Sequence, residues 1–258
     1  MELNLKNKSV IVTGAAQGMG YAIAKGFLEE GAKVLACDIN EQSLLRAVAE
    51  LSAFGSCKPC ICNVMEEKNV QAMVALAQDA FGGVDALINN AGVLRPKKIA
   101  ESSLEEWRQM LDLNLTGTFL CSKHVFLLME RQGRGGFIAN AASFAALIPS
   151  VTHGAYAAAK EAVLSLTRTC AAEFAPANVR VISYTPGVVA TPFTSEMRSD
   201  PDRSEKLLKN IPMRRCAQPE DIANIVVYLA SDKASYVTGC NVEIHGGKLC
   251  VQNPDAAY

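Results

Sequence analysis

The sequence lacks an excess of charge of either sign. Of its 258 residues, 25 are Lys or Arg and 26 are Asp or Glu, so the formal net charge at pH 7 is −1. Such a chain lacks the basic surface that sequence-independent nucleic-acid binding requires, and we expect no nucleic-acid partner. Its 18 glycines and 10 prolines are too few for a fibrous or low-complexity chain, and 50% hydrophobic residues exclude intrinsic disorder.

The sequence also lacks a tract that we predict to be a membrane-spanning helix. The segment Gly135–Ala159 contains no Asp, Glu, Lys or Arg and exceeds the roughly 20 apolar residues that cross a bilayer. However, it includes Asn140, Pro149 and His153, so we interpret it as part of a buried site and expect no membrane partner. The first ten residues, MELNLKNKSV, lack the apolar segment of a signal peptide. The expected location is therefore cytoplasmic.

The nine cysteines form no metal-binding pattern. Their odd number and the missing signal peptide favour free thiols in a reducing compartment. Cys57, Cys60 and Cys62 are close in sequence, but a structural zinc site needs four ligands, usually as two spaced pairs. No second Cys/His pair follows at that spacing. We therefore expect no metal and interpret this segment as a buried strand with small apolar side chains.

Strand-like and helix-like segments alternate along the chain, as judged from apolar periodicity and turn residues. The predicted strands are Ser9–Thr13, Lys33–Asp38, Cys57–Val64, Val84–Asn89, Gly136–Ala141, Val179–Tyr184 and Val242–Ile244. The predicted helices are Met19–Glu30, Glu41–Ala53, Glu66–Phe81, Leu104–Arg131, Ala155–Phe174 and Pro219–Ala230. Parallel strands with right-handed crossovers and helices on both faces predict a three-layer, doubly wound α/β fold of the Rossmann type. No linker-like break is present, so we expect a single domain over residues 1–258.

A glycine-rich segment, GAAQGMG at residues 14–20, lies between the first predicted strand and helix. Gly14 permits a tight turn, Gly18 lets the backbone approach a pyrophosphate, and Gly20 lets the helix and strand pack closely. The helix N-terminus adds amide donors for phosphates. Alone this is a weak signal, because ordinary strand-to-helix turns also favour glycine, but its place in the first βαβ unit favours a dinucleotide site. No Gly-Lys-Ser/Thr follows, which excludes a phosphate loop of the NTPase kind.

Asp38, at the end of the second predicted strand, points to the identity of the dinucleotide. A carboxylate at this place accepts hydrogen bonds from an adenosine ribose, although an acid near a helix N-terminus is an alternative interpretation. The carboxylate would repel a 2′-phosphate. No Lys or Arg occupies residues 15–17, and Ile39 and Asn40 follow Asp38. The sequence therefore predicts NAD rather than NADP.

Several motifs together resemble the classical short-chain dehydrogenase/reductase family over nearly the whole chain. These motifs are the glycine pattern of residues 14–20, Asn89-Asn90-Ala91-Gly92, Asn114, Ser143, Tyr156-x-x-x-Lys160 and Pro186-Gly187. Their combination is highly specific, although each motif alone is not. The resemblance implies an oxidoreductase that transfers a hydride between a nicotinamide and a secondary alcohol or ketone.

The resemblance also implies the roles of individual residues. A catalytic tetrad would comprise Asn114, Ser143, Tyr156 and Lys160. Cofactor contacts would come from Gly14, Gln17, Gly18, Met19, Gly20, Asp38, Asn63, Val64, Asn90, Ala91, Gly92, Tyr156, Lys160, Pro186, Gly187, Val189 and Thr191. Asn63 departs from the family, where Asp is frequent, but its side-chain oxygen can still accept a bond from an adenine amino group. Ala142 replaces the first of two frequent serines, and His245 stands where Asp is frequent.

The chemistry of the tetrad residues agrees with these roles. Tyr156 and Lys160 are four residues apart in a predicted helix and share one face. A free phenol has a pKa near 10, and we expect the nearby ammonium and a positively charged nicotinamide to favour the phenolate. Tyr156 could then act as general acid or base, while Ser143 could bond the substrate oxygen. An exposed pair of side chains on a helix is the alternative interpretation of Tyr-x-x-x-Lys.

Other functions and the substrate stay open at this stage. A non-catalytic dinucleotide-sensing protein on the same fold would tolerate loss of Tyr156 or Lys160, and both are present. A 3-oxoacyl thioester reductase is a further alternative, whereas family members that are dehydratases, epimerases or isomerases usually have longer C-terminal regions. Secondary alcohols, sugars, hydroxysteroids and 3-oxoacyl thioesters are all possible substrates. The expected pocket comprises Leu94, Phe144, Leu147, Pro149, His153, Val188 and a substrate-covering segment at residues 192–212, with Met197, Arg198, Arg203, Lys206 and Lys209 further out.

The segment Leu113–Met129 predicts self-association, because Lys123 is its only charged residue. A helix that is apolar on nearly all sides must be covered on more than one face, by the sheet and by a partner subunit or surrounding loops. The resemblance implies a homotetramer, or at least a two-fold dimer. The substitutions Phe126→Glu and Leu127→Glu should then show which side of the helix forms the interface. His124 in this helix is expected to pack or cap.

Overall fold

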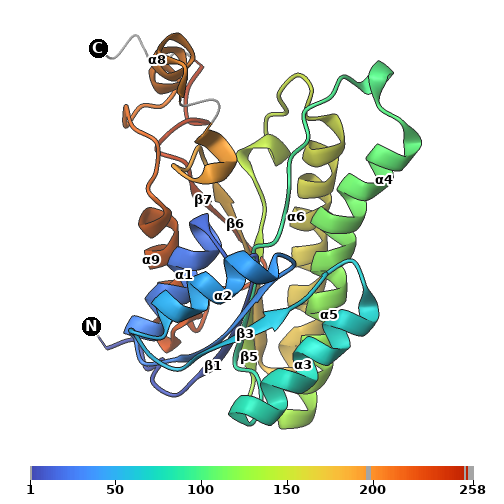
Figure 1. Ribbon diagram of the computed structural model, residues 1–258, viewed down its shortest axis with the longest axis vertical. Coiled ribbons are helices and arrows are strands. Elements are labelled where there is room, and N and C mark those ends of the chain that lie inside the picture. The colour runs from blue at the N-terminus through green and yellow to red at the C-terminus, as the bar shows by residue number, and fades with distance from the viewer. Residues whose placement is uncertain (1, 196–198, 253, 255–258) are drawn as a thin grey trace.

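The computed structural model describes residues 2–195, 199–252 and 254, and it is built around one parallel sheet (Figure 1). The seven strands have the order β3-β2-β1-β4-β5-β6-β7, and each neighbouring pair is parallel. Their bounds are β1 Ser9–Thr13, β2 Lys33–Asp38, β3 Cys57–Ile61, β4 Ala86–Asn89, β5 Gly136–Ala141, β6 Val179–Pro186 and β7 Asn241–Ile244. The predicted doubly wound α/β fold is confirmed. The chain reverses its direction across the sheet between β1 and β4, where such folds bind ligands.

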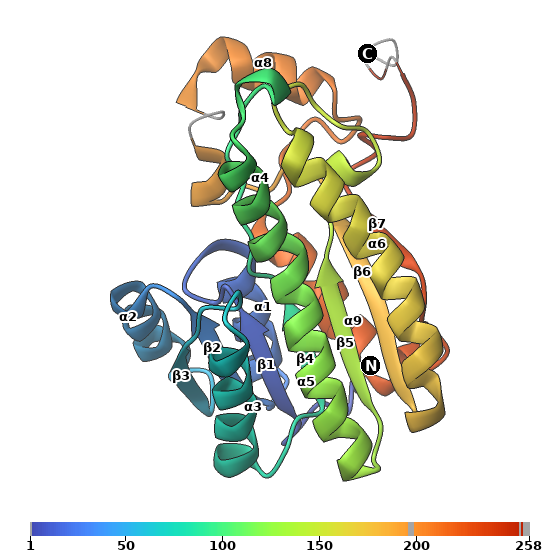
Figure 2. The same cartoon turned by 90° about the vertical axis from the view of Figure 1, so that its right-hand side faces the viewer.

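Helices cover both faces of the sheet. They are α1 Gly18–Glu29, α2 Glu41–Leu51, α3 Glu67–Phe81, α4 Leu104–Leu111, α5 Gly117–Gln132, α6 Gly154–Phe174, α8 Pro201–Lys209 and α9 Pro219–Ala230. Residues of α1, α2 and α9 join one buried apolar cluster, and residues of α3, α5 and α6 join another. Figure 2 shows α5 and α6 in front of the strands, which places the second cluster on the face turned to the viewer.

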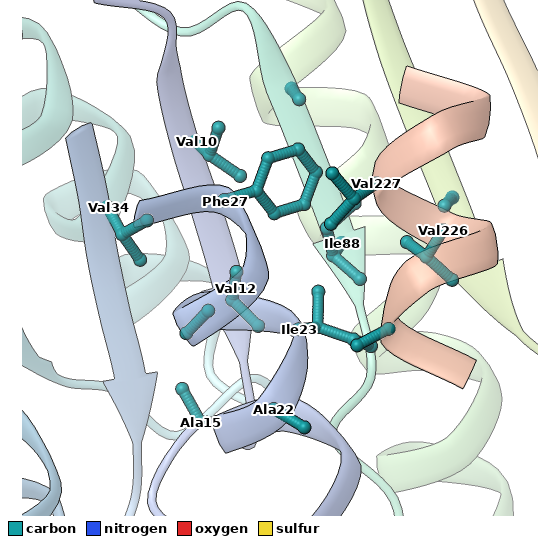
Figure 3. Packing of buried hydrophobic residues seen from close by; sticks show 14 of the residues in the cluster. Val10, Val12, Ala15, Ala22, Ile23, Phe27, Val34, Ile88, Val226 and Val227 are labelled. Atoms are coloured by element: carbon teal, nitrogen blue, oxygen red, sulfur yellow. The ribbon is translucent and has the colours of Figure 1, made fainter. Parts of the chain in front are cut away.

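The core explains why the central strands are apolar. The edge strand β3 (Cys57–Ile61) is instead largely exposed, so the expectation of a buried strand in this segment is wrong. A parallel strand is buried on both faces, and all five residues of β1 are buried. On one face, Phe27 and Ile23 of α1 lie between the sheet and Val226 and Val227 of α9, with Ile88 of β4 beneath them (Figure 3). This packing fixes the N-terminal end of α1 at the carboxyl end of β1.

The continuous helix predicted for Leu104–Arg131 is wrong in one respect. The structure interrupts it with a π-helical turn, η2 (Asp112–Thr116), in which the Gly117 amide donates to the Asp112 carbonyl. Such turns insert one residue into a helix and are frequent at functional sites. Here the turn carries Asn114 into the interior, where the residue has no exposed surface.

Helix α8 was not predicted, although the sequence contains its start signal. The Asp200 side chain accepts bonds from the amides of Asp202 and Arg203, and Pro201 occupies the first turn. Met197 and Arg198 of the expected substrate-covering segment lie outside the described residues. Across the ranges that the structure describes, no helix has both the length and the apolar character to cross a membrane.

Candidate active site

A cavity of about 530 Å³ opens at the carboxyl ends of the strands, beside the point where β1 and β4 diverge. Most residues predicted for the site line it. These are Gly14, Gln17, Gly18, Met19, Asp38, Asn63, Val64, Asn90, Ala91, Gly92, Ser143, Tyr156, Lys160, Pro186, Gly187, Val189 and Thr191. Gly20 and Asn114 do not line the cavity, but each contacts residues that do. The fold therefore brings segments from the ends of six strands, β1 to β6, to one cavity.

The glycine-rich loop forms one wall of the cavity. Gly14 and Gly18 have φ angles of +65° and +59°, a left-handed conformation that favours glycine. A Cβ atom on Gly20 would overlap the carbonyl oxygen of Gly14, so only glycine allows α1 to start this close to β1. The open backbone and the free amides at the start of α1 fit a dinucleotide pyrophosphate.

A hydrogen-bond network holds this loop to the end of β4. The Thr13 hydroxyl accepts bonds from the amides of Asn90 and Ala91, both at 3.0 Å. The side-chain nitrogen of Asn90, Nδ2, donates to the backbone carbonyls of Thr13 and Gly14 at 3.1 and 3.3 Å. The Tyr184 hydroxyl donates to the side-chain oxygen of Asn90, Oδ1, at 3.3 Å. The Asn90 side chain is thus a structural tie between two strand ends. Sequence reasoning missed Thr13, whose only signal is a hydroxyl residue directly before Gly14.

Asp38 is fixed at the end of β2 with its carboxylate in the cavity wall. Its two oxygens accept bonds from the amides of Ala16 at 3.2 Å and Asn40 at 3.0 Å. Among the described residues that line the cavity, the charged ones are Asp38, Arg95 and Lys160. Neither cation follows β2 or lies in the glycine-rich loop, so this part of the wall carries negative charge alone.

Asn63 lines the cavity in the same region, after β3. Its side-chain oxygen accepts a bond from the Met65 amide at 3.1 Å, and its own amide donates to Asn69 at 3.4 Å. The side chain is therefore held by its own turn. An amide oxygen has a second lone pair, so the predicted adenine contact is compatible with this geometry.

Ser143, Tyr156 and Lys160 meet on another part of the wall. Ser143 follows β5, and its hydroxyl accepts a bond from the Ala145 amide at 3.1 Å. Tyr156 and Lys160 project from the first two turns of α6, as their spacing predicted. The Lys160 ammonium donates to the Ala141 carbonyl at 2.7 Å and lies 5.8 Å from the centre of the Tyr156 ring.

The electrostatics of this group differ from the expectation for Tyr156. Burial raises the pKa of Tyr156, and a hydrogen bond with the Ser143 side chain lowers it by a smaller effect. Burial also lowers the pKa of Lys160 to about 8. The expected lowering of the phenol pKa by the ammonium is therefore wrong for the protein alone, because removal of the phenol from water outweighs its neighbours.

Asn114 is buried next to the cavity wall and holds the segment after β4 by hydrogen bonds. Its amide nitrogen donates to the carbonyls of Val93 and Met110 at 2.9 and 3.0 Å, and its oxygen accepts from the Val93 amide at 3.2 Å. A Cβ atom on Gly92 would lie 2.8 Å from this oxygen and 3.4 Å from the Lys160 nitrogen. Asn114 therefore fixes the segment after β4 against the π-helical turn and close to Lys160.

The remaining wall is mostly apolar. Of the expected pocket residues, Leu94, Phe144, His153 and Val188 line it, as do residues 192–194, whereas Leu147 and Pro149 do not. His153 precedes α6, and burial lowers its pKa. Arg203, Lys206 and Lys209 lie on α8 and are not part of the wall.

Two further expectations concern His124 and metals. His124 was expected to pack or cap within its helix, but its Nε2 lies 2.7 Å from the Glu67 carboxylate, to which Lys123 also donates at 2.9 Å. These two residues therefore connect α5 to α3.

Within the described part of the chain, no group of three or more His, Cys, Asp or Glu side chains is arranged to hold a metal ion.

Comparison with known proteins identifies similar chains over nearly the whole length. A family model described as enoyl-(acyl carrier protein) reductase matches residues 14–248. A 2,5-dichloro-2,5-cyclohexadiene-1,4-diol dehydrogenase of Sphingobium indicum is 38% identical over 246 residues, which cover 95% of this chain and 98% of that protein. A 3-oxoacyl-(acyl-carrier-protein) reductase of Thermotoga maritima is 35% identical over 247 residues, which cover 95% of this chain and 99% of that protein. The crystal structure of a putative NAD(P)-dependent gluconate 5-dehydrogenase from Beutenbergia cavernae, with NADP bound at low occupancy, has a TM-score of 0.91 and 34% identity and covers 97% of this chain and 100% of its own.

Proposed function

The chain belongs to the classical short-chain dehydrogenase/reductase family, and we propose that it is an NAD-dependent enzyme that interconverts a secondary alcohol and a ketone. One observation carries this proposal. A single cavity joins the glycine-rich loop and Asp38 to Ser143, Tyr156 and Lys160. A dinucleotide site and an acid–base group in the same cavity support hydride transfer coupled to proton transfer.

NAD fits the residues of this cavity. The open backbone at Gly14 and Gly18 and the amides at the start of α1 would hold the pyrophosphate, and Asp38 would accept bonds from the adenosine ribose. The Beutenbergia structure contains NADP, so a related chain with the same fold accepts a 2′-phosphate. The preference for NAD therefore rests on the carboxylate of Asp38, which would repel a 2′-phosphate.

The nicotinamide, when bound, accepts or supplies the hydride. In the reduction direction, the Tyr156 hydroxyl donates its proton to the substrate oxygen, and in oxidation the Tyr156 phenolate accepts the proton of the substrate alcohol. The Ser143 hydroxyl donates a hydrogen bond to the same substrate oxygen. The Lys160 amine, with a pKa of about 8, can take up or release a proton near neutral pH and is held beside the ring by Ala141. Asn114 positions the backbone after β4 through its two bonds to Val93.

We propose a small-molecule alcohol or ketone as the substrate, with an apolar body that suits the wall of Leu94, Phe144 and Val188. Residues 192–212 would cover it, since Pro192 and Phe193 line the cavity and Phe193 keeps 53% of its surface exposed. A single domain and a cytoplasmic location complete the proposal.

The test is an oxidation and reduction screen that follows the absorbance of reduced nicotinamide. The panel contains cyclic diols, hydroxysteroids, sugar acids and simple secondary alcohols, each with NAD⁺ and NADP⁺, and the corresponding ketones with NADH. Tyr156→Phe serves as the control, because it keeps the ring and removes the hydroxyl. Turnover that the variant lacks would support the proposal. Dinucleotide binding without turnover on any substrate would instead support the non-catalytic sensing protein.

A 3-oxoacyl thioester reductase is the second candidate, and the Thermotoga relative favours it. This activity would use the same Tyr156 and Ser143 on a thioester substrate whose long arm leaves the cavity. Efficient reduction of an acetoacetyl thioester, together with no oxidation of cyclic alcohols, would select this candidate.

A further inference from the structure

Four buried cysteines gather beside the part of the cavity that holds Asp38. Cys37 lies in β2, Cys60 in β3, Cys62 just after β3, and Cys121 in α5. All four belong to the apolar cluster on the sheet face covered by α3 and α5, and we call them the thiol cluster. Cys37 and Cys62 also line the cavity. The proposed reaction uses none of these thiols.

Cys37 and Cys60 face each other across neighbouring strands. They are partners in the parallel ladder between β2 and β3, so their side chains point to the same face. Paired strands lie about 4.8 Å apart, which is within the roughly 4.4–6.8 Å between the Cα atoms of a disulfide. Cys60 lies on the edge strand and is 8% exposed, compared with 1% for Cys37.

The Cys37 thiol donates a hydrogen bond to the Leu35 carbonyl at 3.6 Å. The Cys37 side chain lowers the pKa of Cys60 against the effect of burial, while burial and the Cys60 side chain raise the pKa of Cys37. Because the thiolate is the reactive form, Cys60 is the better nucleophile of the pair. Cys37 is then placed to react with an oxidised Cys60.

The backbone of this pair is bonded directly to the proposed cofactor site. The Ala15 amide donates to the Cys37 carbonyl at 3.0 Å, and the Cys62 amide donates to the Asp38 carbonyl at 3.0 Å. A disulfide holds the Cβ atoms of its two cysteines about 3.8 Å apart, less than the roughly 4.8 Å between paired strands, so forming it requires a local adjustment of β2 against β3. Such a movement displaces Asp38 relative to the glycine-rich loop, to which its carboxylate is bonded through Ala16.

We propose that Cys37 and Cys60 are a peroxide-sensitive pair whose disulfide weakens dinucleotide binding, an inference that rests on the proposed function for its effect on the cofactor. The Cys60 thiolate attacks one oxygen of a peroxide, the O–O bond breaks, and a sulfenic acid and one water form. The Cys37 sulfur then displaces the hydroxyl of the sulfenic acid, which leaves as a second water as the S–S bond forms. Two thiols lose two electrons and two protons, and the peroxide is reduced.

The experiment uses a Cys240→Ser/Cys250→Ser background, because these two thiols are exposed and would link separate molecules. The protein is treated with hydrogen peroxide, mapped by mass spectrometry of non-reduced peptides, and titrated with NADH by fluorescence. We expect a Cys37–Cys60 linked peptide, an affinity for NADH reduced about tenfold through the loss of a bond to a charged group, and recovery with dithiothreitol. Bound NAD⁺ should slow the linkage.

Two variants give the matched comparison. Cys60→Ser should keep its NADH affinity after peroxide, whereas Cys57→Ser, on the same strand but packed against the opposite core, should respond like the background. Absence of the linked peptide, an unchanged affinity after linkage, or an equal loss in Cys60→Ser would overturn the proposal. A reduced background protein that binds no NADH would overturn the proposed function and the cofactor effect, while the linked peptide alone would still establish the disulfide site.

Discussion

The carboxylate of Asp38 accepts a hydrogen bond from the Ala16 amide at 3.2 Å and so connects the end of β2 to the glycine-rich loop. This contact fixes a negative charge beside the residues that would hold the adenosine ribose. Asn40 donates to the other carboxylate oxygen at 3.0 Å, so the side chain is held at both oxygens. We infer that a carboxylate held in this way disfavours the 2′-phosphate of NADP.

The first prediction is that the protein prefers NAD⁺ to NADP⁺ by at least about tenfold in kcat/KM, because like charges placed together cost several kcal/mol. Asp38→Asn removes the charge and keeps one acceptor oxygen, whereas Asp38→Ala removes both. Both variants should reduce the ratio of kcat/KM for NAD⁺ to that for NADP⁺. Asp38→Ala should in addition weaken the binding of NAD⁺. Steady-state kinetics with both dinucleotides measure this. Equal values for the unaltered protein would contradict the assignment of Asp38.

The second prediction concerns catalysis by Tyr156. Tyr156→Phe should lower kcat by about 10²- to 10⁴-fold, the usual contribution of a general acid or base. The ring packing is kept, so the midpoint of thermal unfolding should change little. Near-normal turnover in this folded variant would remove Tyr156 from its proposed role.

The third prediction follows from the lowered pKa of Lys160. The amine titrates at about 8 in the folded protein and at roughly 10.4 in an unfolded chain. Between these values the unfolded chain binds the additional proton, so this residue makes the free energy of unfolding rise with pH. The unaltered protein should therefore gain stability relative to Lys160→Met as the pH increases from about 8 to about 10. Denaturant unfolding across this range measures the difference, and a constant difference would show that Lys160 is not desolvated.

The fourth prediction tests how closely the segment after β4 approaches the tetrad. Gly92→Ala would place a Cβ atom 2.8 Å from the Asn114 oxygen and 3.4 Å from the Lys160 nitrogen. Because a displacement of about 1 Å near the reacting groups can cost about 10²-fold in rate, kcat should fall by about that factor. Because Gly92 is also an expected cofactor contact, fluorescence titration with NADH measures any loss of cofactor affinity separately from the loss in kcat. An unchanged kcat would show that neither side chain needs its present position.

The sequence predicted the sheet well because buried parallel strands are short apolar runs bounded by turn residues. The bounds of β1, β2 and β5 agree with the predicted strands. The π-helical turn at 112–116 was not predictable, because residues 113–129 are apolar on nearly all sides and an inserted residue leaves no break in such a pattern. Helix α8 was missed for another reason, since Leu207 and Leu208 are its only large apolar residues and are too few to reveal a helical repeat.

For the candidate site, motif spacing predicted which residues line the cavity but not how they interact. Tyr156 and Lys160 lie on one helix face, as four-residue spacing requires. The direction of the Tyr156 pKa shift depends on burial, which depends on side chains from other parts of the chain and not on spacing. The hydrogen bond between Asn90 and Thr13 likewise could not be predicted, because it depends on the pairing of β1 with β4, which are far apart in sequence.

The exposed face of α5 bears on the proposed assembly. Phe119 and Leu127 are 43% and 38% exposed, while Val125 and Met129 on the opposite face are fully buried. Phe126 stacks on Phe174 with ring centres 3.7 Å apart, so it packs within the subunit. The two substitutions suggested by the sequence, at Phe126 and Leu127, therefore test different contacts.

The last prediction is that the protein is a homotetramer, or at least a two-fold dimer, through this face of α5. Leu127→Glu places a charge in the proposed interface and should shift the mass in sedimentation equilibrium toward the 27.6 kDa of one chain. Phe126→Glu should instead lower the free energy of unfolding, because it removes a ring contact inside the subunit. A single 27.6 kDa species of the unaltered protein at micromolar concentration would contradict the assembly. A larger species that Leu127→Glu leaves intact would place the interface on another surface, because a charge in a buried apolar contact cannot be accommodated without loss of affinity.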